Sequence, residues 1–456
     1  MIKKAKSRFV CQSCGYVAPR WVGRCPECNE WNTVIEEAVP EKEARPSGEG
    51  ITARPIFLAS LDRAEVTRMT TGIGELDRVL GGGLVPGSVV LVGGDPGVGK
   101  TTLLMEAVSR LAGAGIESLY VSGEESGAQL ALRARRMDLD LAAFQALFTT
   151  SLTVIEAAMN DRRPRVVVID SIQTTADPDI GSAPGSIGQI REVAQKLTQY
   201  AKQNAMAVLL VGHITKEGAI AGPKVLEHLV DTVLYFEGGT HYPYRILKAH
   251  KNRFGPTHEV GIFEMKEQGL LEVANPSELF LTRRDTPISG AAVTAAIEGT
   301  RSIMVEVQSL TTPGALAVPR RTSMGIDYNR TAIIAAVLEK KAGVNLSSHD
   351  IFVNVAGGIK LSEPAVDLAL AASLASSHTD IPIPPGTVFF GEIGLSGEVT
   401  AVSQSAMRIA EAKRLGFVRA VVPGENASTE AATPAMAVVG IKNVGELIGL
   451  LNSFRR

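Results

Sequence analysis

The chain has 456 residues, of which 45% are hydrophobic and 21% are charged, and its formal net charge is −2. These values are typical of a soluble globular protein with two or three domains, and they argue against a uniformly basic nucleic-acid-binding coat. Because no run of about 18 apolar residues and no apolar signal core is found, we expect a cytoplasmic protein without membrane association.

All four cysteines lie within the first 28 residues, in two Cys-x-x-Cys pairs. Cys11 and Cys14 form the first pair, and Cys25 and Cys28 form the second. Four thiolates with this spacing can surround one Zn²⁺ ion tetrahedrally, so we predict a structural zinc-binding domain at residues 1–35. A disulfide pair or a redox dithiol is the alternative. Metal binding would supply most of the folding free energy of so short a segment.

Residues 36–56 are charged and rich in Pro and Gly, a composition typical of a flexible linker. From residue 57 to 272, apolar runs alternate with helical patterns. Strands are predicted at 88–92, 117–121, 166–169, 205–211 and 230–236. This alternation indicates an α/β domain with a parallel sheet that is covered by helices on both faces.

A P-loop follows the first of these strands. The motif G-x-x-x-x-G-K-[ST] is filled by Gly94, Asp95, Pro96, Gly97, Val98, Gly99, Lys100 and Thr101, and Thr102 opens a helical pattern. Glycines let successive backbone N–H groups point at one anion, and the helix N-terminus adds its positive dipole end. We expect the loop to bind ATP, with Lys100 reaching the β- and γ-phosphates and the Thr101 hydroxyl coordinating Mg²⁺.

Polar residues end three other predicted strands of this domain. Asp170 stands where P-loop proteins place the carboxylate that supports Mg²⁺ through water. Glu124 is our candidate to orient or deprotonate the attacking water, in preference to Glu125. Alternatively, both acids only favour the first turn of the next helix. His213 is a candidate sensor of the γ-phosphate, although a structural histidine is the other interpretation.

The order of Glu124, Asp170 and His213 resembles the RecA/DnaB class of P-loop ATPases. The stretch KNRFG at residues 251–255 resembles the signature of the bacterial RadA (Sms) DNA-repair family, and with the four cysteines the resemblance covers essentially the whole chain. It implies that Lys251 and Arg253 enter the active site of the neighbouring subunit and neutralise charge on the γ-phosphate in the transition state. A solvated basic face is the alternative.

Residues 285–456 resemble the α+β proteolytic domain of the Lon protease family, through GEIGLSGEV at 391–399 and the helix after Glu363-Pro364. Lon enzymes use a serine nucleophile that a lysine activates, whereas Ala365 and Ala406 stand at the matching positions. We therefore expect no peptidase activity.

The remaining elements of this domain are predicted from periodicity and charge. A strand pattern covers 291–307, and helices are predicted at 331–341 and 365–376. Residues 319–330 (PRRTSMGIDYNR) place three arginines and a tyrosine in one loop-like stretch. These side chains suit a phosphate backbone with occasional base stacking, although a solvated surface or an interface is an equally simple reading from the residues alone.

The resemblance implies an ATP-dependent DNA-repair protein. Its members would be DNA-stimulated ATPases that form a hexameric ring, hold single-stranded DNA and drive branch migration of recombination intermediates together with the RecA recombinase. An ATP-dependent protease of Lon type and a regulatory ATPase of the circadian-clock kind are the alternative functions.

Overall fold

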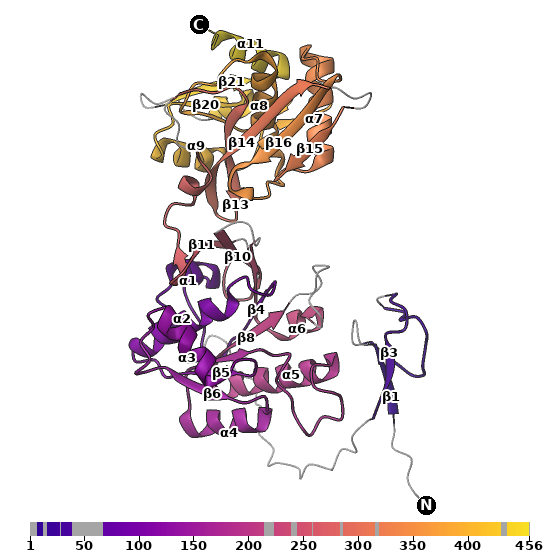
Figure 1. Cartoon of the computed structure of the whole chain (residues 1–456), viewed down its shortest axis with the longest axis vertical. Coiled ribbons are helices and arrows are strands. Elements are labelled where there is room, and N and C mark those ends of the chain that lie inside the picture. The colour runs from indigo at the N-terminus through magenta and orange to yellow at the C-terminus, as the bar shows by residue number, and fades with distance from the viewer. Residues whose placement is uncertain are drawn as a thin grey trace, which may run out of the picture. The chain divides into compact units, whose positions relative to one another are not determined.

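The computed structural model describes residues 7–11, 16–27, 29–38, 67–213, 223–238, 244–257, 259–282, 286–314, 319–429 and 436–455. The chain divides into two compact units, Met1–Val273 and Ala274–Arg456 (Figure 1). Each unit is described by itself.

Three short strands near the N-terminus form an antiparallel sheet in the order β2-β1-β3. They are β1 (Ser7–Cys11), β2 (Val17–Ala18) and β3 (Val34–Ala38). Cys11, Cys25 and Val34 are buried together, whereas Trp21 and Trp31 are exposed. So small a core supplies little burial free energy, as expected of a segment that folds around a metal ion.

The rest of the first unit is built on a nine-stranded sheet in the order β12-β11-β10-β9-β4-β8-β7-β5-β6. The parallel part consists of β4 (Val89–Gly94), β5 (Ser118–Ser122), β6 (Gln145–Phe148), β7 (Val166–Asp170), β8 (Ala207–His213) and β9 (Thr232–Glu237). Three antiparallel strands extend it: β10 (Tyr244–Asn252), β11 (Val260–Lys266) and β12 (Gly269–Glu272). The predicted parallel sheet is confirmed, and the antiparallel extension makes the whole sheet mixed.

Helices cover both faces of this sheet, as predicted. They are α1 (Gly74–Leu80), α2 (Lys100–Gly113), α3 (Gly127–Arg136), α4 (Leu152–Arg162), α5 (Ile187–Asn204) and α6 (Pro223–Leu229). Alternate residues of β4 divide between two cores, because successive strand side chains point to opposite faces. Val90 and Val92 pack with residues of α1, α2 and α3, whereas Val89 and Leu91 pack with residues of α4, α5 and α6.

The second unit has a seven-stranded sheet in the order β15-β16-β14-β13-β17-β20-β21. Its strands are β13 (Ala291–Glu298), β14 (Arg301–Pro313), β15 (Arg321–Met324), β16 (His349–Val355), β17 (Thr387–Phe389), β20 (Arg419–Pro423) and β21 (Ala437–Ile441). A separate pair is formed by β18 (Glu392–Ile393) and β19 (Val399–Thr400). The helices are α7 (Tyr328–Ala342), α8 (Asp367–Thr379), α9 (Ser405–Arg414), α10 (Gly424–Thr429) and α11 (Val444–Ser453), with short 3-10 turns η2 (Pro276–Leu279), η3 (Ala356–Gly358) and η4 (Pro364–Val366).

Two predictions for this unit need correction. The strand pattern at 291–307 is a hairpin of two strands, because the chain turns at Gly299, which has a φ of 67°. The stretch 319–330 is not one loop, since it contains edge strand β15 and the start of α7.

Among the helices of the described residues, none combines the length and the apolar character needed to cross a membrane.

Candidate nucleotide-binding site

The P-loop connects β4 to α2 at the carboxyl edge of the parallel strands, the usual edge for ligands in such sheets. Two of its glycines are required for different reasons. A Cβ on Gly94 would lie 2.6 Å from the Phe236 carbonyl oxygen, so the loop fits against β9 only without a side chain there. Gly99 has a φ of 116°, a backbone conformation that residues with side chains rarely adopt.

Lys100 is buried at the start of α2 and curls back onto the loop. Its Nζ donates to the backbone oxygens of Gly94 at 2.7 Å and Asp95 at 3.0 Å. Burial lowers the pKa of Lys100, and the carboxylates of Asp170, Glu124 and Asp95 oppose that effect. A buried ammonium group held by two neutral carbonyls can exchange them for phosphate oxygens, which compensate its charge better.

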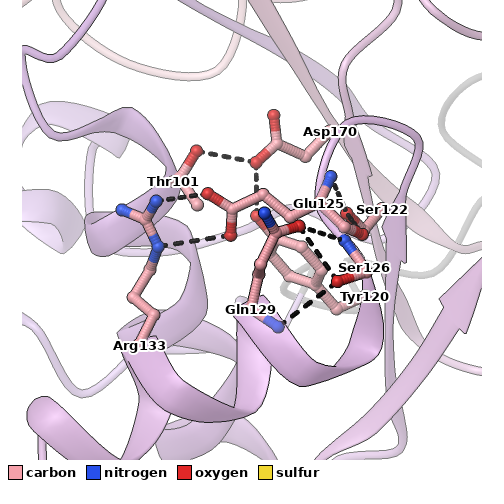
Figure 2. A network of polar contacts seen from close by, with 8 residues as sticks. All are labelled: Thr101, Tyr120, Ser122, Glu125, Ser126, Gln129, Arg133 and Asp170. Atoms are coloured by element: carbon pink, nitrogen blue, oxygen red, sulfur yellow. Dashed lines mark hydrogen bonds and ion pairs between the residues drawn. The ribbon is translucent and has the colours of Figure 1, made fainter.

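Thr101 and Asp170 meet beside Lys100. The Thr101 hydroxyl donates to Asp170 Oδ2 at 2.7 Å, and Asp170 is the last residue of β7 (Figure 2). A hydroxyl and a carboxylate are the hard oxygen donors that Mg²⁺ prefers. These two residues therefore fit a magnesium ion, as the sequence predicts.

Tyr120 is a member of this cluster that the sequence did not reveal. It lies in β5, and its hydroxyl donates to the same oxygen, Asp170 Oδ2, at 2.5 Å (Figure 2). In the sequence it stands between Leu119 and Val121, so the strand pattern indicates a core side chain. The available signal was its place in β5, because Tyr120 pairs with Val168 of the neighbouring β7, and Asp170 follows Val168 by two residues on the same face of the sheet.

The two acids after β5 separate. Glu124 Oε1 accepts a hydrogen bond of 2.5 Å from Ser171 Oγ, next to Asp170. The Glu125 carboxylate instead forms an ion pair with Arg133 of α3 (Figure 2). Neither acid caps α3, whose first turn is closed by a Ser126–Gln129 capping box. The fold thus brings Glu124, rather than Glu125, toward Lys100 and Asp170.

His213 ends β8, and its backbone pairs with Gly94 of the P-loop strand. Its side chain lies outside the described residues, so its role as a sensor stays a prediction.

Lys251 and Arg253 lie close to the ends at which strands β4 and β9 begin, whereas the P-loop lies where these strands end. Asn252, between them, pairs with Thr232, and Thr232 pairs with Val90 at the beginning of β4. The P-loop starts at Gly94, which is about 13 Å further along the strand at the usual rise per residue. The structure therefore does not bring these two cations to the chain's own triphosphate site.

The surroundings of the two cations differ. Lys251 Nζ donates to the backbone oxygens of Glu227 at 2.6 Å and Val230 at 2.8 Å, just where α6 ends. Arg253 pairs with Asp231 at 3.2 Å, and its side chain remains 52% exposed. Lys251 thus stabilises a helix end, whereas Arg253 is available at the surface.

Two of the four predicted zinc ligands can be located. Cys11 and Cys25 are buried in one core, and Cys11 Sγ lies 3.1 Å from Thr33 Oγ1. Cys14 and Cys28 lie outside the described residues. The shared burial of the two described thiols suits a thiolate site, whose full ligand set stays a prediction.

The predicted features of the second unit have mixed outcomes. Ala365 is buried in η4, and Ala406 lies in α9. Arg330 is not available for DNA, because it forms an ion pair with Asp367 and donates to the Ile393 carbonyl oxygen. Arg320 and Tyr328 of the same stretch are exposed.

Three family models match separate parts of the chain. Residues 59–219 match an AAA domain, residues 9–36 match a rubredoxin metal-binding domain, and residues 321–426 match subunit ChlI of Mg-chelatase. A solved KaiC-like protein from Pyrococcus horikoshii OT3 aligns with 46% of this chain and 99% of its own, at 22% identity and a TM-score of 0.40.

Curated relatives match nearly the whole length. DNA repair protein RadA of Bacillus subtilis (strain 168) is 47% identical over 98% of both chains. RadA of Halalkalibacterium halodurans is 48% identical over 98% of both, and RadA of Streptococcus pyogenes serotype M1 is 48% identical over 99% of this chain and 100% of its own. The chain belongs to the RadA family of DNA-repair proteins. It is a P-loop ATPase of that family, with an N-terminal metal-binding domain and a ChlI- or Lon-like C-terminal region.

Proposed function

We propose that this RadA-family chain is a DNA-dependent ATPase motor of the cytoplasm. It assembles into a hexameric ring, binds single-stranded DNA and drives branch migration of recombination intermediates together with the RecA recombinase. The observation that carries the proposal is the place of Arg253, half-exposed at the sheet edge that lies away from its own P-loop. A cation in that place can act on ATP only in a neighbouring copy.

The reaction follows from the roles of five side chains. Lys100 and the loop amides bind the phosphates, and Thr101 and Asp170 hold Mg²⁺, which neutralises phosphate charge when it is bound. Glu124 accepts a proton from the attacking water as the water oxygen bonds to the γ-phosphorus and the bond to the ADP oxygen breaks. Arg253 of the next protomer donates to the γ-phosphate oxygens, which makes hydrolysis depend on assembly.

Mixing two inactive variants tests the shared site. Lys100→Ala removes the cation of the chain's own loop, and Arg253→Ala removes the lent one, at an expected cost of about 10³–10⁵ in rate. In a random equal mixture, half of the sites keep Lys100 and half of those adjoin an intact Arg253, so roughly a quarter of the wild-type ATPase rate should return. An arginine that serves its own site would give no recovery at any ratio.

The matched control is Arg191→Ala, which removes an exposed arginine of α5. This variant should keep full activity and should not complement Lys100→Ala beyond simple dilution. A monomer that hydrolyses ATP at the wild-type rate without Arg253 would overturn the ring and the motor together.

DNA dependence is tested separately. Phosphate contacts are strongest at low salt, so single-stranded DNA should stimulate ATP hydrolysis there and lose its effect as salt rises. Replacing the exposed Arg320 by Ala should flatten the slope of log affinity against log salt by about 0.7. ATP hydrolysis that is indifferent to DNA at low salt would favour a regulatory ATPase instead.

Zinc is proposed as the metal of the N-terminal domain because four thiolates suit its tetrahedral preference. Metal analysis of the purified full chain should give one zinc ion per chain. A chain that carries iron in its place would contradict this assignment, since Cys₄ sites can also bind iron.

A further inference from the structure

Tyr120 contributes the one buried phenol among the groups that surround Asp170 in Figure 2. Its side chain is fully buried, and its hydroxyl is 2.5 Å from Asp170 Oδ2. Thr101 donates to that same oxygen at 2.7 Å. Two hydroxyl donors on one carboxylate oxygen fix both the position and the rotation of the Asp170 side chain.

Packing alone does not account for the hydroxyl. The ring of Tyr120 lies in the core that α2 and α3 cover, and it contacts the ring of Phe144 with centroids 5.9 Å apart. A phenylalanine would make the same ring contacts. A buried hydroxyl costs free energy unless it is hydrogen-bonded, so its presence is explained by the acceptor it reaches.

The direction of this hydrogen bond follows from its two groups. The Asp170 carboxylate can only accept, so the Tyr120 hydroxyl is the donor of the pair. Burial raises the pKa of Tyr120 well above its ordinary value, and the neighbouring Asp170 carboxylate raises it further.

We propose that Tyr120 is a positioning residue for the magnesium site, whose hydroxyl holds the Asp170 carboxylate in the orientation that supports Mg²⁺ beside Thr101. This inference rests on the proposed binding of Mg²⁺ and nucleotide at the P-loop. Partners that orient metal-supporting groups typically change metal affinity by about 10–100-fold when they are removed. The Asp170 carboxylate without Tyr120 would keep one hydroxyl donor, from Thr101, and would rotate more freely.

The test measures nucleotide affinity with and without the metal. Full-length wild type and Tyr120→Phe are titrated with a fluorescent ADP analogue, first in EDTA and then in buffers of increasing free Mg²⁺. In EDTA, Tyr120→Phe should bind the analogue within about twofold of wild type, because the P-loop amides and Lys100 are unchanged. The free Mg²⁺ that gives half of the affinity gain should rise by about 10–100-fold.

The control is Tyr200→Phe, which removes a phenol that donates to Asn160 Oδ1 at 2.8 Å. Tyr200 lies near the end of α5, which precedes β8, so it belongs to the edge opposite the P-loop. This variant should leave the Mg²⁺ midpoint unchanged. Incorporation of 4-aminophenylalanine at position 120 restores a donor and should return the midpoint toward wild type, whereas 4-fluorophenylalanine keeps the bulk without a donor and should not.

The outcomes separate the two proposals. Equal loss of affinity in EDTA and in Mg²⁺ would show that Tyr120 only maintains the loop, and an unchanged midpoint would also overturn its positioning role. If the wild-type chain itself gained no affinity from Mg²⁺, the proposed nucleotide site would fail instead. If Tyr120→Phe does not fold, the comparison of 4-aminophenylalanine with 4-fluorophenylalanine at position 120 still gives a decisive result.

Discussion

Lys100 in the first unit and Arg408 in the second are buried basic side chains that lie close to predicted site positions, and they are held differently. Lys100 in the first unit rests on two backbone oxygens, at 2.7 and 3.0 Å. Arg408 in the second unit is 1% exposed and binds both oxygens of Glu363, at 2.9 and 2.6 Å. Carbonyls that lose a cation can rebind water, whereas the buried Arg408 guanidinium without Glu363 would be left with an uncompensated charge. Lys100 is therefore exchangeable, and Arg408 is committed to the fold.

In the Lon-like region, the Glu363–Arg408 ion pair lies between the two segments that hold Ala365 and Ala406. Arg408 follows Ala406 on α9, and Glu363 precedes Ala365 at η4, so the ion pair joins the two segments that hold the dyad positions. The Arg408 guanidinium also donates to the carbonyl oxygens of Ala295 and Ser403. The contacts of Arg408 therefore tie α9 to the chain around η4 and to strand β13.

The largest expected effect separates the neighbouring acids Glu124 and Glu125, of which only one is expected to take part in hydrolysis. Glu124 accepts a hydrogen bond from the Ser171 hydroxyl beside Asp170, whereas Glu125 forms an ion pair with Arg133. Glu124→Gln should lower kcat by about 10²–10⁴ because it removes the proton acceptor. Glu125→Gln, the matched control, should change kcat by less than about threefold, since it loses only a partly exposed ion pair. Steady-state ATPase rates measure both, and equal losses would mean that the assignment of the two acids is wrong.

The second prediction concerns the loss of the ion pair between Glu363 and Arg408. Glu363→Gln should destabilise the second unit by about 3–5 kcal/mol, because Arg408 would stay buried without a counter-charge. Urea unfolding followed through this unit measures the loss. Exchanging both partners for apolar residues, as in Glu363→Leu with Arg408→Met, should recover much of it. A single variant as stable as wild type would show that Arg408 can reach water and is not committed.

The third effect concerns the exchangeable cation. Lys100→Met should lower kcat by about 10²–10³ and abolish the thermal stabilisation that Mg·ADP gives. Without nucleotide the variant should be as stable as wild type or slightly more stable. The pKa of Lys100 is lower in the folded chain than in the unfolded chain, so keeping its proton costs stability at neutral pH. This cost is fully present below the folded pKa and disappears above the unfolded value near 10.5.

The control for Lys100 is Lys202→Met, because Lys202 is a 53% exposed lysine of the same unit. It should alter neither kcat nor the Mg·ADP effect. A large loss of stability in nucleotide-free Lys100→Met would contradict the exchangeable arrangement, since it would mean that the fold needs this cation.

The sequence predicted the groups that lie at strand ends and missed those that depend on packing. Asp170 was predictable because apolar strands in a parallel sheet end at one edge, and the register of β7 beside β5 bears this out. Tyr120 was not, because whether a phenol inside an apolar run reaches an acceptor depends on the neighbouring strand. Arg330 was misread as a surface cation, since only the tertiary fold brings Asp367 against it.

The hairpin error has a simpler cause. Residues 291–307 are rich in Ala, Val and Ile on both sides of Gly299, so the pattern alone predicts one long strand. The pair Gly299-Thr300 was the available signal, because a glycine at the first central position is typical of two-residue hairpin turns. The place of this glycine between two apolar runs predicts the turn, whereas the composition of the runs does not.

The smallest expected effect concerns an exposed ion pair of the second unit, Glu411 with Arg414, and it depends on pH. Hydrogen bonding from Arg414 lowers the pKa of Glu411, and Ser277 adds to this effect. Because the folded pKa lies below the unfolded value of 4.5, the stabilisation is fully present above pH 4.5 and is lost as the pH falls through the folded pKa. Arg414 is 54% exposed, so Arg414→Met should cost only about 0.2–1 kcal/mol at pH 7 and nothing once Glu411 is protonated. Urea unfolding at pH 7 and at an acid pH below the folded pKa of Glu411 measures this difference. The variant Lys360→Met, at an exposed lysine, is the control. A loss that persists in acid would mean that Arg414 stabilises the unit mainly through packing or through its hydrogen bond to Asn275, because only the charge interaction vanishes with the proton.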